Sequence, residues 1–313
     1  MISSTVLVAT WSDGLFVVAD GTWQHELANR SVRALAADGR GGALAIIDGR
    51  SLSRRACDGA WSTIVTVEFD LACCVAVGDV IYVGTDDARV MRVNADGEIL
   101  QLRGFDAVPG RDRWYAGTAL INGQVVGPPL GIRSITATSD GAVLLANVHV
   151  GGIPRSSDCG ATWRPTIDID SDVHEVRAHP NRPDIVVAAA AVGLCTSRDG
   201  GATWEVEKEG LHAPYCSAVG FAGDDVLVSA SADHFAAQGG IYRRRVDGHD
   251  PLVAVAGLPR WIDGRADTRC ISTKDSAVAI ADQKGNLYVS GDAAHSWSRQ
   301  ADGLALPSSV LIV

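Results

Sequence analysis

The chain has 313 residues, of which 47% are hydrophobic and 20% are charged, a composition typical of a folded globular protein. Its formal net charge of −10 argues against a nucleic acid or a membrane surface as partner, because both need a basic face. No apolar run is long enough to span a bilayer, and residues 1–6 lack the features of a signal peptide. Seven cysteines without paired spacing indicate a reducing compartment, so we expect a cytoplasmic protein without disulfides, metal or cofactor.

Short β-rich runs bounded by turn residues follow one another along the chain, and none shows the apolar spacing of a helix. The first run covers residues 5–9. The second unit has runs over 32–36, 43–47, 51–53 and 61–65. The fifth unit repeats this plan over 173–178, 185–190, 194–197 and 204–206. The predicted building block is therefore a sheet of four short strands.

A turn motif recurs between the last two runs of each unit. Residues 156–163 and 197–204 both fit Ser-x-Asp-x-Gly-x-Thr-Trp, and 290–297 is a degenerate copy that lacks the glycine and has serine in place of threonine. Weaker copies keep only the aspartate turn. The seven turn aspartates are Asp20, Asp58, Asp96, Asp158, Asp199, Asp247 and Asp292. They are 38 to 48 residues apart except for one interval of 62, which predicts a seven-bladed β-propeller of four-stranded blades with one insertion.

These motifs resemble the Asp-box, or bacterial neuraminidase repeat, and the chain resembles the sialidase-like superfamily of Asp-box β-propellers from end to end. In that superfamily the boxes lie on the turns away from the usual pocket. The resemblance therefore implies that the boxes stabilise turns and carry no catalytic residue. The Phe/Tyr-Arg-Ile-Pro signature of neuraminidases does not occur, and those enzymes generally have six blades. We do not expect sialidase activity.

The two ends of the chain predict how the ring closes. Residues 5–9 occupy the place of a second strand, so the first blade lacks its innermost strand. The apolar run 309–313 is expected to supply that strand, which pairs two edges that would otherwise be exposed. We therefore predict one all-β propeller domain over residues 1–313, closed by the C-terminal strand. The insertion over about 105–131 is expected on the upper face, between blades three and four.

Alignment of the blades places one residue of each inner strand at the mouth of the central channel. These residues are Arg33, Cys73, Arg133, His174, Cys216, Arg269 and Ser309. The three arginines would repel one another unless a negative group lies among them. A carboxylate, phosphate or sulfate ligand with bidentate contacts would supply that charge. The alternative is an internal acid, for which the candidates are Glu26, Glu68, Asp70 and Glu175.

Aromatic residues on the loops of this face are candidate walls of the site. Trp114 lies in the insertion, Trp261 lies in the connection 258–265, and Trp11 follows the first strand. Tryptophan beside arginine suits a ligand that combines a ring with an anionic group. With Arg33, Arg133, Arg269 and Cys216, they form the predicted ligand-binding set.

Three residues near the channel mouth are candidate catalytic groups. We expect His174 to act as acid or base, because neighbouring arginines favour its neutral form. Tyr215 adjoins the ring, and His149 ends a strand on the same face. The leading hypothesis is therefore a pocket for a small anionic, cyclic ligand, with hydrolase or lyase chemistry. The alternative is a non-catalytic module whose same face binds a protein partner, since propellers host both.

Overall fold

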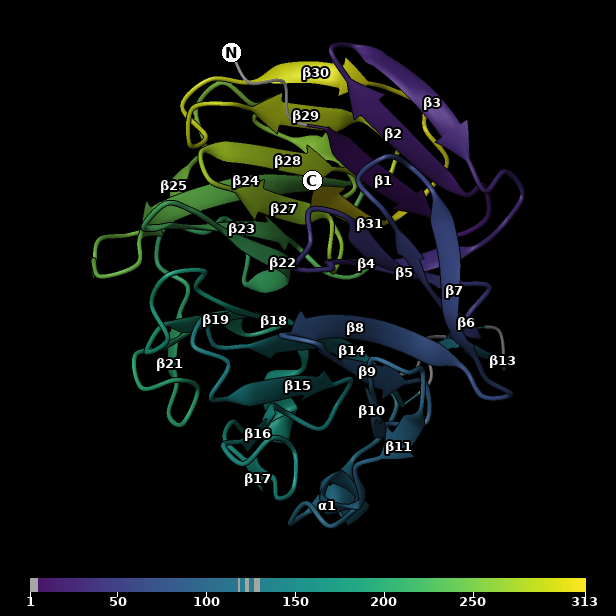
Figure 1. Ribbon diagram of the computed structural model, residues 1–313. Coiled ribbons are helices and arrows are strands. Elements are labelled where there is room, and N and C mark those ends of the chain that lie inside the picture. Colours follow the sequence, from purple (N-terminus) through teal and green to yellow (C-terminus); the bar gives the residue numbers. More distant parts are fainter. Residues whose placement is uncertain (1–4, 118, 122–123, 127–129) are drawn as a thin grey trace.

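Seven antiparallel sheets surround a central axis in the computed structural model, which describes residues 5–117, 119–121, 124–126 and 130–313 (Figure 1). Each sheet contains a path of four strands, and the inner strand of each contacts the inner strands of both neighbouring sheets. The protein is therefore a seven-bladed β-propeller, as the spacing of the turn aspartates predicted.

The first three blades have the following strands. Blade one contains β1 (Val6–Thr10), β2 (Leu15–Ala19), β3 (Thr22–Glu26) and β31 (Pro307–Ile312). Blade two contains β4 (Val32–Ala37), β5 (Ala43–Ile47), β6 (Ser51–Arg55) and β7 (Trp61–Thr66). Blade three contains β8 (Leu71–Val77), β9 (Val80–Thr85), β10 (Val90–Val93) and β11 (Ile99–Gln101).

The other four blades follow the same order from the axis outward. Blade four contains β14 (Ile132–Ala137), β15 (Leu144–Val148), β16 (Pro154–Ser156) and β17 (Arg164–Pro165). Blade five contains β18 (Val173–Ala178), β19 (Val186–Ala190), β20 (Gly193–Ser197) and β21 (Glu205–Glu207). Blade six contains β22 (Tyr215–Ala222), β23 (Asp225–Ser231), β24 (Gln238–Arg245) and β25 (Val253–Ala254), with β26 (Ile262–Asp263) also paired to β24. Blade seven contains β27 (Ile271–Lys274), β28 (Ala277–Ala281), β29 (Leu287–Ser290) and β30 (Ser298–Ala301).

The C-terminal strand closes the ring as predicted. β31 pairs with β1 in antiparallel register, with Ser309 opposite Ala9 and Leu311 opposite Leu7. Beyond the strand, the N–H of Val313 donates to the carbonyl of Thr5 at 3.0 Å. The inner strand of blade one therefore comes from the opposite end of the chain from its other three strands.

The second strands hold the blades together. In blades one, two, four, five and seven this strand is buried along its whole length. Its sequence is therefore mostly apolar rather than alternating, with Thr10 and Asn147 as the polar residues of these five strands, because both faces pack against neighbouring blades. The strands of blades two and five lie within two residues of the predicted runs.

The aspartates of the strongest turn motifs accept hydrogen bonds from other residues of the same turn. Asp158, Asp199 and Asp292 each accept the N–H of the residue four positions ahead at 2.8–2.9 Å. The same residue, a threonine or serine, also donates its hydroxyl at 2.6 Å. In Asp158 these hydrogen bonds lower the pKa of the carboxyl to about 2, and the bond from the Thr162 hydroxyl contributes most. The carboxylates thus stabilise turns on the outer side of the blades.

The segment between β11 and β14 contains two short helices and a hairpin: α1 (Arg103–Asp106), η1 (Arg111–Arg113), and β12 (Ala119–Ile121) paired with β13 (Gln124–Val126). Another short helix, η2 (Ile169–Ser171), precedes β18. Phe105 of α1 is fully buried and meets Trp163 edge to face at a ring separation of 5.1 Å. The start of this segment is therefore a wedge between blades three and four. Within the described residues, no helix has the length and hydropathy needed to cross a membrane.

Candidate functional site

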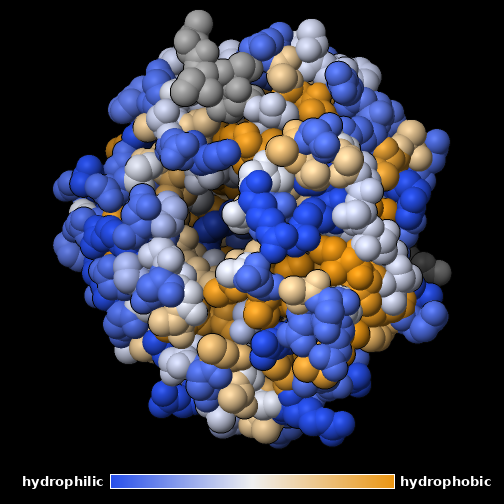
Figure 2. Space-filling view, viewed as in Figure 1, coloured by the Kyte–Doolittle hydropathy of each residue, from blue (hydrophilic) through white to orange (hydrophobic). Residues whose placement is uncertain are grey.

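A cavity of about 380 Å³ lies at the axis, at the end of the ring where the inner strands begin. We call this end the cavity end. Arg33 of blade two, Arg133 of blade four and Arg269 of blade seven all line the cavity. Other lining residues are Trp11, Asp86, His234, Asp267, Thr268 and Ser308. The ring is also visibly hollowed at its centre in the space-filling view, with hydrophilic side chains inside the hollow (Figure 2).

β-bulges near the start of the inner strands determine which side chains reach the cavity. In six blades the pairing of this strand shifts by one residue, at Arg33, Ala72, Arg133, His174, Ser217 and Ser308. A bulge adds one residue to a strand and redirects its side chain. Four of these six residues line the cavity.

The bulges correct the predicted ring in three blades. The bulged residues there are Ala72, Ser217 and Ser308, whereas the alignment chose Cys73, Cys216 and Ser309. The prediction assumed strict alternation of side chains along the strand, and alternation fails at a bulge. The error is one residue in each case.

Two residues predicted to contact a ligand are buried in the core instead. Cys216 is fully buried in a cluster with Val219 and Val228, and this burial raises the pKa of its thiol. Trp114 packs against Phe105 at 5.6 Å and carries the guanidinium of Arg111 over its ring at 4.8 Å. Neither side chain lines the cavity. Their predicted contact with a ligand is corrected accordingly.

The other two predicted tryptophans are exposed at the cavity end. Trp11 lines the cavity, and its N–H donates to the carbonyl of Leu306 at 3.1 Å. Trp261 lies farther out, where the guanidinium of Arg260 stacks on its ring at 4.3 Å and His212 meets its edge at 4.7 Å. It does not line the cavity.

Arg33 is neutralised by an acid of the next blade. Its Nη1 donates to Asp86 at 2.7 Å and to the carbonyl of Leu71 at 3.3 Å. The pKa of Asp86 is raised by burial, which the charge of Arg33 only partly offsets. Gly49, with a φ of +71°, lets Arg33 pass close by, since a Cβ there would lie 2.6 Å from its Cζ. Asp86 was not among the internal acids considered from the sequence.

Arg269 reaches across the mouth of the channel. Its backbone has a φ of +67°, which is unfavourable for a residue with a side chain. Its guanidinium donates to the carbonyl of Arg133 at 2.5 Å and to that of Arg33 at 3.3 Å. Its amide N–H donates to the buried carboxylate of Glu175 at 3.1 Å. One residue of blade seven is thus bonded to blades two, four and five.

Arg133 is the cation with the least compensation. It is half-buried, and its Nη2 donates to the hydroxyl of Thr268 at 3.2 Å. Among the described residues no carboxylate lies within 4.0 Å of its guanidinium. Burial lowers its pKa, against the weaker opposing effect of the Asp267 charge. Its charge is thus offset at longer range, by Asp267 and Asp172, rather than by a carboxylate in direct contact.

A second charged pair forms the wall beside Arg133. Arg265, fully buried, donates to Asp267 at 3.1 Å and also contacts the carbonyl and ring of His234. Burial alone would raise the pKa of Asp267, but the charges of Arg265 and Arg133 outweigh it and lower the pKa. Burial, together with Arg265, lowers the pKa of His234. No strand periodicity indicates this pair, because both members lie in the irregular loop between β26 and β27.

The three predicted catalytic residues lie near the cavity without lining it. His174 is buried, donates from Nδ1 to the carbonyl of Cys216 at 2.5 Å, and has Nε2 3.6 Å from Asp172. Its ring lies 4.5 Å from that of Tyr215 at an interplanar angle of 43°, and burial raises the pKa of Tyr215 to about 12. His149 is buried and accepts the N–H of Gly117 at 3.3 Å. Their catalytic role stays a prediction.

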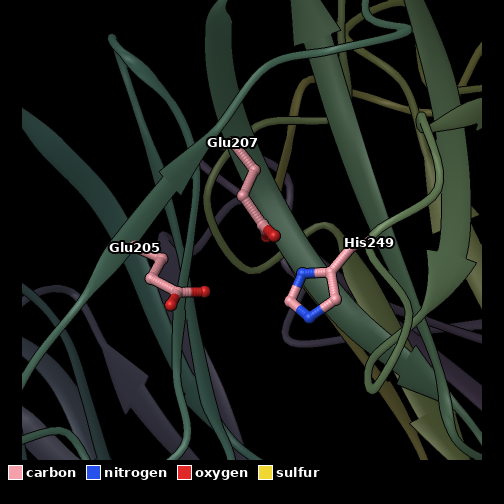
Figure 3. A group of neighbouring side chains, drawn as sticks. All are labelled: Glu205, Glu207 and His249. Atoms are coloured by element: carbon pink, nitrogen blue, oxygen red, sulfur yellow. The ribbon is translucent and has the colours of Figure 1, made fainter.

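One group of side chains outside the cavity has the composition of a metal site. Glu205, Glu207 and His249 point toward one another, with ligand atoms within 4.8 Å (Figure 3). However, Arg198 donates to Glu205 at 2.7 Å and Arg244 to Glu207 at 2.5 Å. Both carboxylates are therefore already neutralised by arginines, which disfavours a divalent cation.

Comparison with known proteins shows similarity of fold but no similarity of sequence that would indicate a family. No protein-family profile matches the sequence, and no curated protein is significantly similar to it. Among solved structures, YCF48 bound to D1 peptide superimposes with a TM-score of 0.58 and 15% identity, over 88% of this chain and 83% of that one. The propeller in a nidogen/laminin complex gives 0.52 and 12%, over 99% and 98%.

A glycoside hydrolase is also similar in fold. The GH74 xyloglucanase from Xanthomonas campestris superimposes with a TM-score of 0.57 and 16% identity, over 86% of this chain but 45% of that one. Structures this distant in sequence share the fold, and their functions differ. They include a peptide-bound propeller, a propeller in a protein complex and a hydrolase.

Proposed function

We propose that the protein works by binding, and that its central cavity takes the anionic group of a ligand. The observation that carries this proposal is Arg133, a half-buried cation that lines the cavity and has no carboxylate partner among the described residues. Arg269 is the second such cation, since its guanidinium contacts only carbonyl oxygens in the hydrogen bonds described. Two positive charges in a partly desolvated cavity favour an anion strongly.

The other charges around the cavity balance within the chain. Arg33 is paired with Asp86 and Arg265 with Asp267, so neither pair needs a ligand. We infer that Arg133 and Arg269 contact the ligand directly, while the carbonyl of Arg33 holds the Arg269 guanidinium in place. Trp11 at the edge of the cavity suits a ligand with an apolar or cyclic part.

Binding fits the geometry better than hydrolase or lyase chemistry does. A general base must reach the atom it deprotonates, and His174 is buried with Nδ1 bonded to a backbone carbonyl. Tyr215 is held in its neutral form by burial, with a pKa of about 12. Catalysis through these residues would require both to move.

We further propose that the chain is an Asp-box propeller of the cytoplasm. The matching hydrogen bonds of Asp158, Asp199 and Asp292 support the first part, because they serve the same structural purpose in three blades. Seven unpaired cysteines, five of them buried, support the second.

The test is calorimetric titration with benzoate and phenyl phosphate, two cyclic anions. We expect at least one of the two anions to bind. Arg133→Ala should weaken this binding at least tenfold, because a charge-assisted hydrogen bond contributes about 1.5–3 kcal/mol to the binding free energy. Arg133→Lys should restore part of the affinity. Arg198→Ala, which removes an arginine of the turn between β20 and β21, is the control and should bind as the wild type does.

Absence of binding by the wild-type protein would overturn the proposal, and so would equal affinity in Arg133→Ala. Thermal unfolding of each variant, followed by circular dichroism, separates loss of the site from loss of the fold.

A further inference from the structure

The exposed large apolar side chains are unevenly distributed over the molecule. Four of them lie on outermost strands: Trp23, Leu100, Val206 and Val253. The other seven lie on loops, and we call these seven the rim: Trp11, Phe69, Tyr115, Val192, Phe235, Trp261 and Leu306. Among the described residues, no large apolar side chain is exposed on a loop at the opposite end.

Every rim residue lies at the cavity end of the ring. Each inner strand begins at this end, so in an antiparallel blade the second-to-third connection and the link to the next blade return to it. Trp11, Val192 and Phe235 lie on second-to-third connections. The other four lie on links between blades. The rim therefore surrounds the entrance of the cavity.

Contacts join parts of the rim to the cavity. Trp11 lines the cavity and is bonded through its N–H to Leu306 at 3.1 Å. Phe235 meets the ring of His234, a lining residue, at 5.1 Å. Phe235 is 70% exposed and Trp11 46% exposed, so both offer surface to a partner. The two side chains come from blades one and six.

The rim is too widely spread for a ligand that fits the cavity. Its members come from connections in or between all seven blades, whereas the cavity holds about 380 Å³. A small anion could touch Trp11 but not the others. Aromatic residues and arginine are both enriched at protein interfaces, so exposed aromatic side chains beside cavity arginines fit a polypeptide partner better.

We propose that the cavity end docks a polypeptide that inserts an acidic side chain into the cavity and lays apolar residues on the rim. This inference rests on the proposed anion site and names its ligand class. Charge complementarity supports it, because Arg133 and Arg269 require a negative group at the centre. A nucleic acid fits less well, because the protein carries a net charge of −10 and the rim is apolar.

The probe is a random peptide library selected on the immobilised full chain. Selected peptides should share a glutamate or aspartate flanked by apolar residues. Replacing that acid by its amide in a synthetic peptide should weaken binding about tenfold, as should Arg133→Ala in the protein. The rim is tested by the double variant Trp11→Ser/Phe235→Ser, for which we also expect about a tenfold loss.

The matched control is Val206→Ser/Val253→Ser, which removes exposed apolar surface from outer strands and should leave peptide affinity unchanged. If benzoate or phenyl phosphate binds in an Arg133-dependent way but no peptide motif is enriched, the anion site stands and the docking inference is wrong. The docking inference is also wrong if peptides bind the rim variant as tightly as the wild type, or if oligonucleotides bind in their place. If neither anions nor peptides bind, both proposals fall.

Discussion

At the scale of the residue, His179 is expected to make the stability of the fold sensitive to acid. It is buried in blade five, where its ring meets Phe221 at 4.6 Å and its Nδ1 accepts the N–H of Asn181 at 3.1 Å. Burial lowers its pKa below 6.5, against the opposing charge of Asp224. The unfolded chain therefore binds the proton more readily, and the stability supplied by neutral His179 is lost as the pH falls from 6.5 to the lowered pKa.

We expect urea denaturation midpoints to fall between pH 8 and pH 5, and to fall less in His179→Gln. Exposed His249→Gln is the control, and its midpoints should change with pH as those of the wild type do. An unchanged pH dependence in His179→Gln would show that other groups cause the acid sensitivity.

Gly49 tests whether the position of Arg33 matters to the site. Gly49→Ala adds a methyl group at a φ of +71° and 2.6 Å from the Arg33 guanidinium carbon. Gly39 has the same φ, and a Cβ added there would have no atom within 4 Å, so Gly39→Ala carries the backbone strain alone. We expect about 1 kcal/mol of destabilisation from the strain in both variants.

Only Gly49→Ala should also lower affinity for anions, because Arg33 anchors the Arg269 guanidinium through its carbonyl. Titration of both variants with phenyl phosphate measures the difference. Equal affinities would mean that Arg33 can shift without effect on the site.

At the scale of the element, the aspartate turns differ in how much they stabilise their blades. Asp158 accepts the N–H and the hydroxyl of Thr162 and the hydroxyl of Ser156, whereas Asp96 accepts only the N–H of Glu98. Asp158→Ala should therefore lower Tm by several degrees and Asp96→Ala by less. Differential scanning calorimetry of the two variants checks this order, and a larger loss in Asp96→Ala would contradict it.

The inner strands show where prediction from sequence succeeds and where it fails. Strand bounds follow from apolar runs and turn residues, and these are local signals. The bulge at Ala72 leaves no comparable signal, because Ala72 and Cys73 both suit a strand. The predicted ring therefore missed Ala72 and Ser308, which line the cavity, while Arg33 and Arg133 were found because the bulge happens to fall on the aligned residue.

The acids that pair with the cavity arginines, Asp86 and Asp267, could not be predicted from the sequence, for a different reason. Asp86 follows a second strand, and Asp267 lies in the loop before the seventh blade. Asp86 is 53 residues from Arg33, so nothing local in the sequence relates the two, whereas Asp267 is only two residues from Arg265. Packing of neighbouring blades brings Arg33 to Asp86, and the irregular path of one loop pairs Arg265 with Asp267.

At the scale of the whole molecule, closure by β31 predicts that the chain can be permuted. A short turn joining Val313 to Thr5 would connect β31 to β1 as the first two strands of an ordinary blade, since those residues already share a backbone hydrogen bond. New ends can be placed in the connection between β3 and β4. We expect this permutant to fold and to unfold within a few degrees of the parent.

Circular dichroism and size-exclusion chromatography measure the outcome. Deleting residues 307–313 is the contrasting variant, which should aggregate because it exposes the edge of β1 and uncovers Val6 and Val8, which share a buried cluster with Val310 and Ile312. A permutant that aggregates in the same way would show that the ring depends on the natural order of its strands.

The same pair of strands determines how the molecule would respond to mechanical tension. β1 and β31 are antiparallel, so Thr5 and Val313 lie at the same end of their ladder. Pulling on both ends of the chain would load the hydrogen bonds one after another, as in a zipper, rather than all at once in shear. In an optical trap the C-terminal strand should peel away first and at low force, opening the ring before any blade unravels.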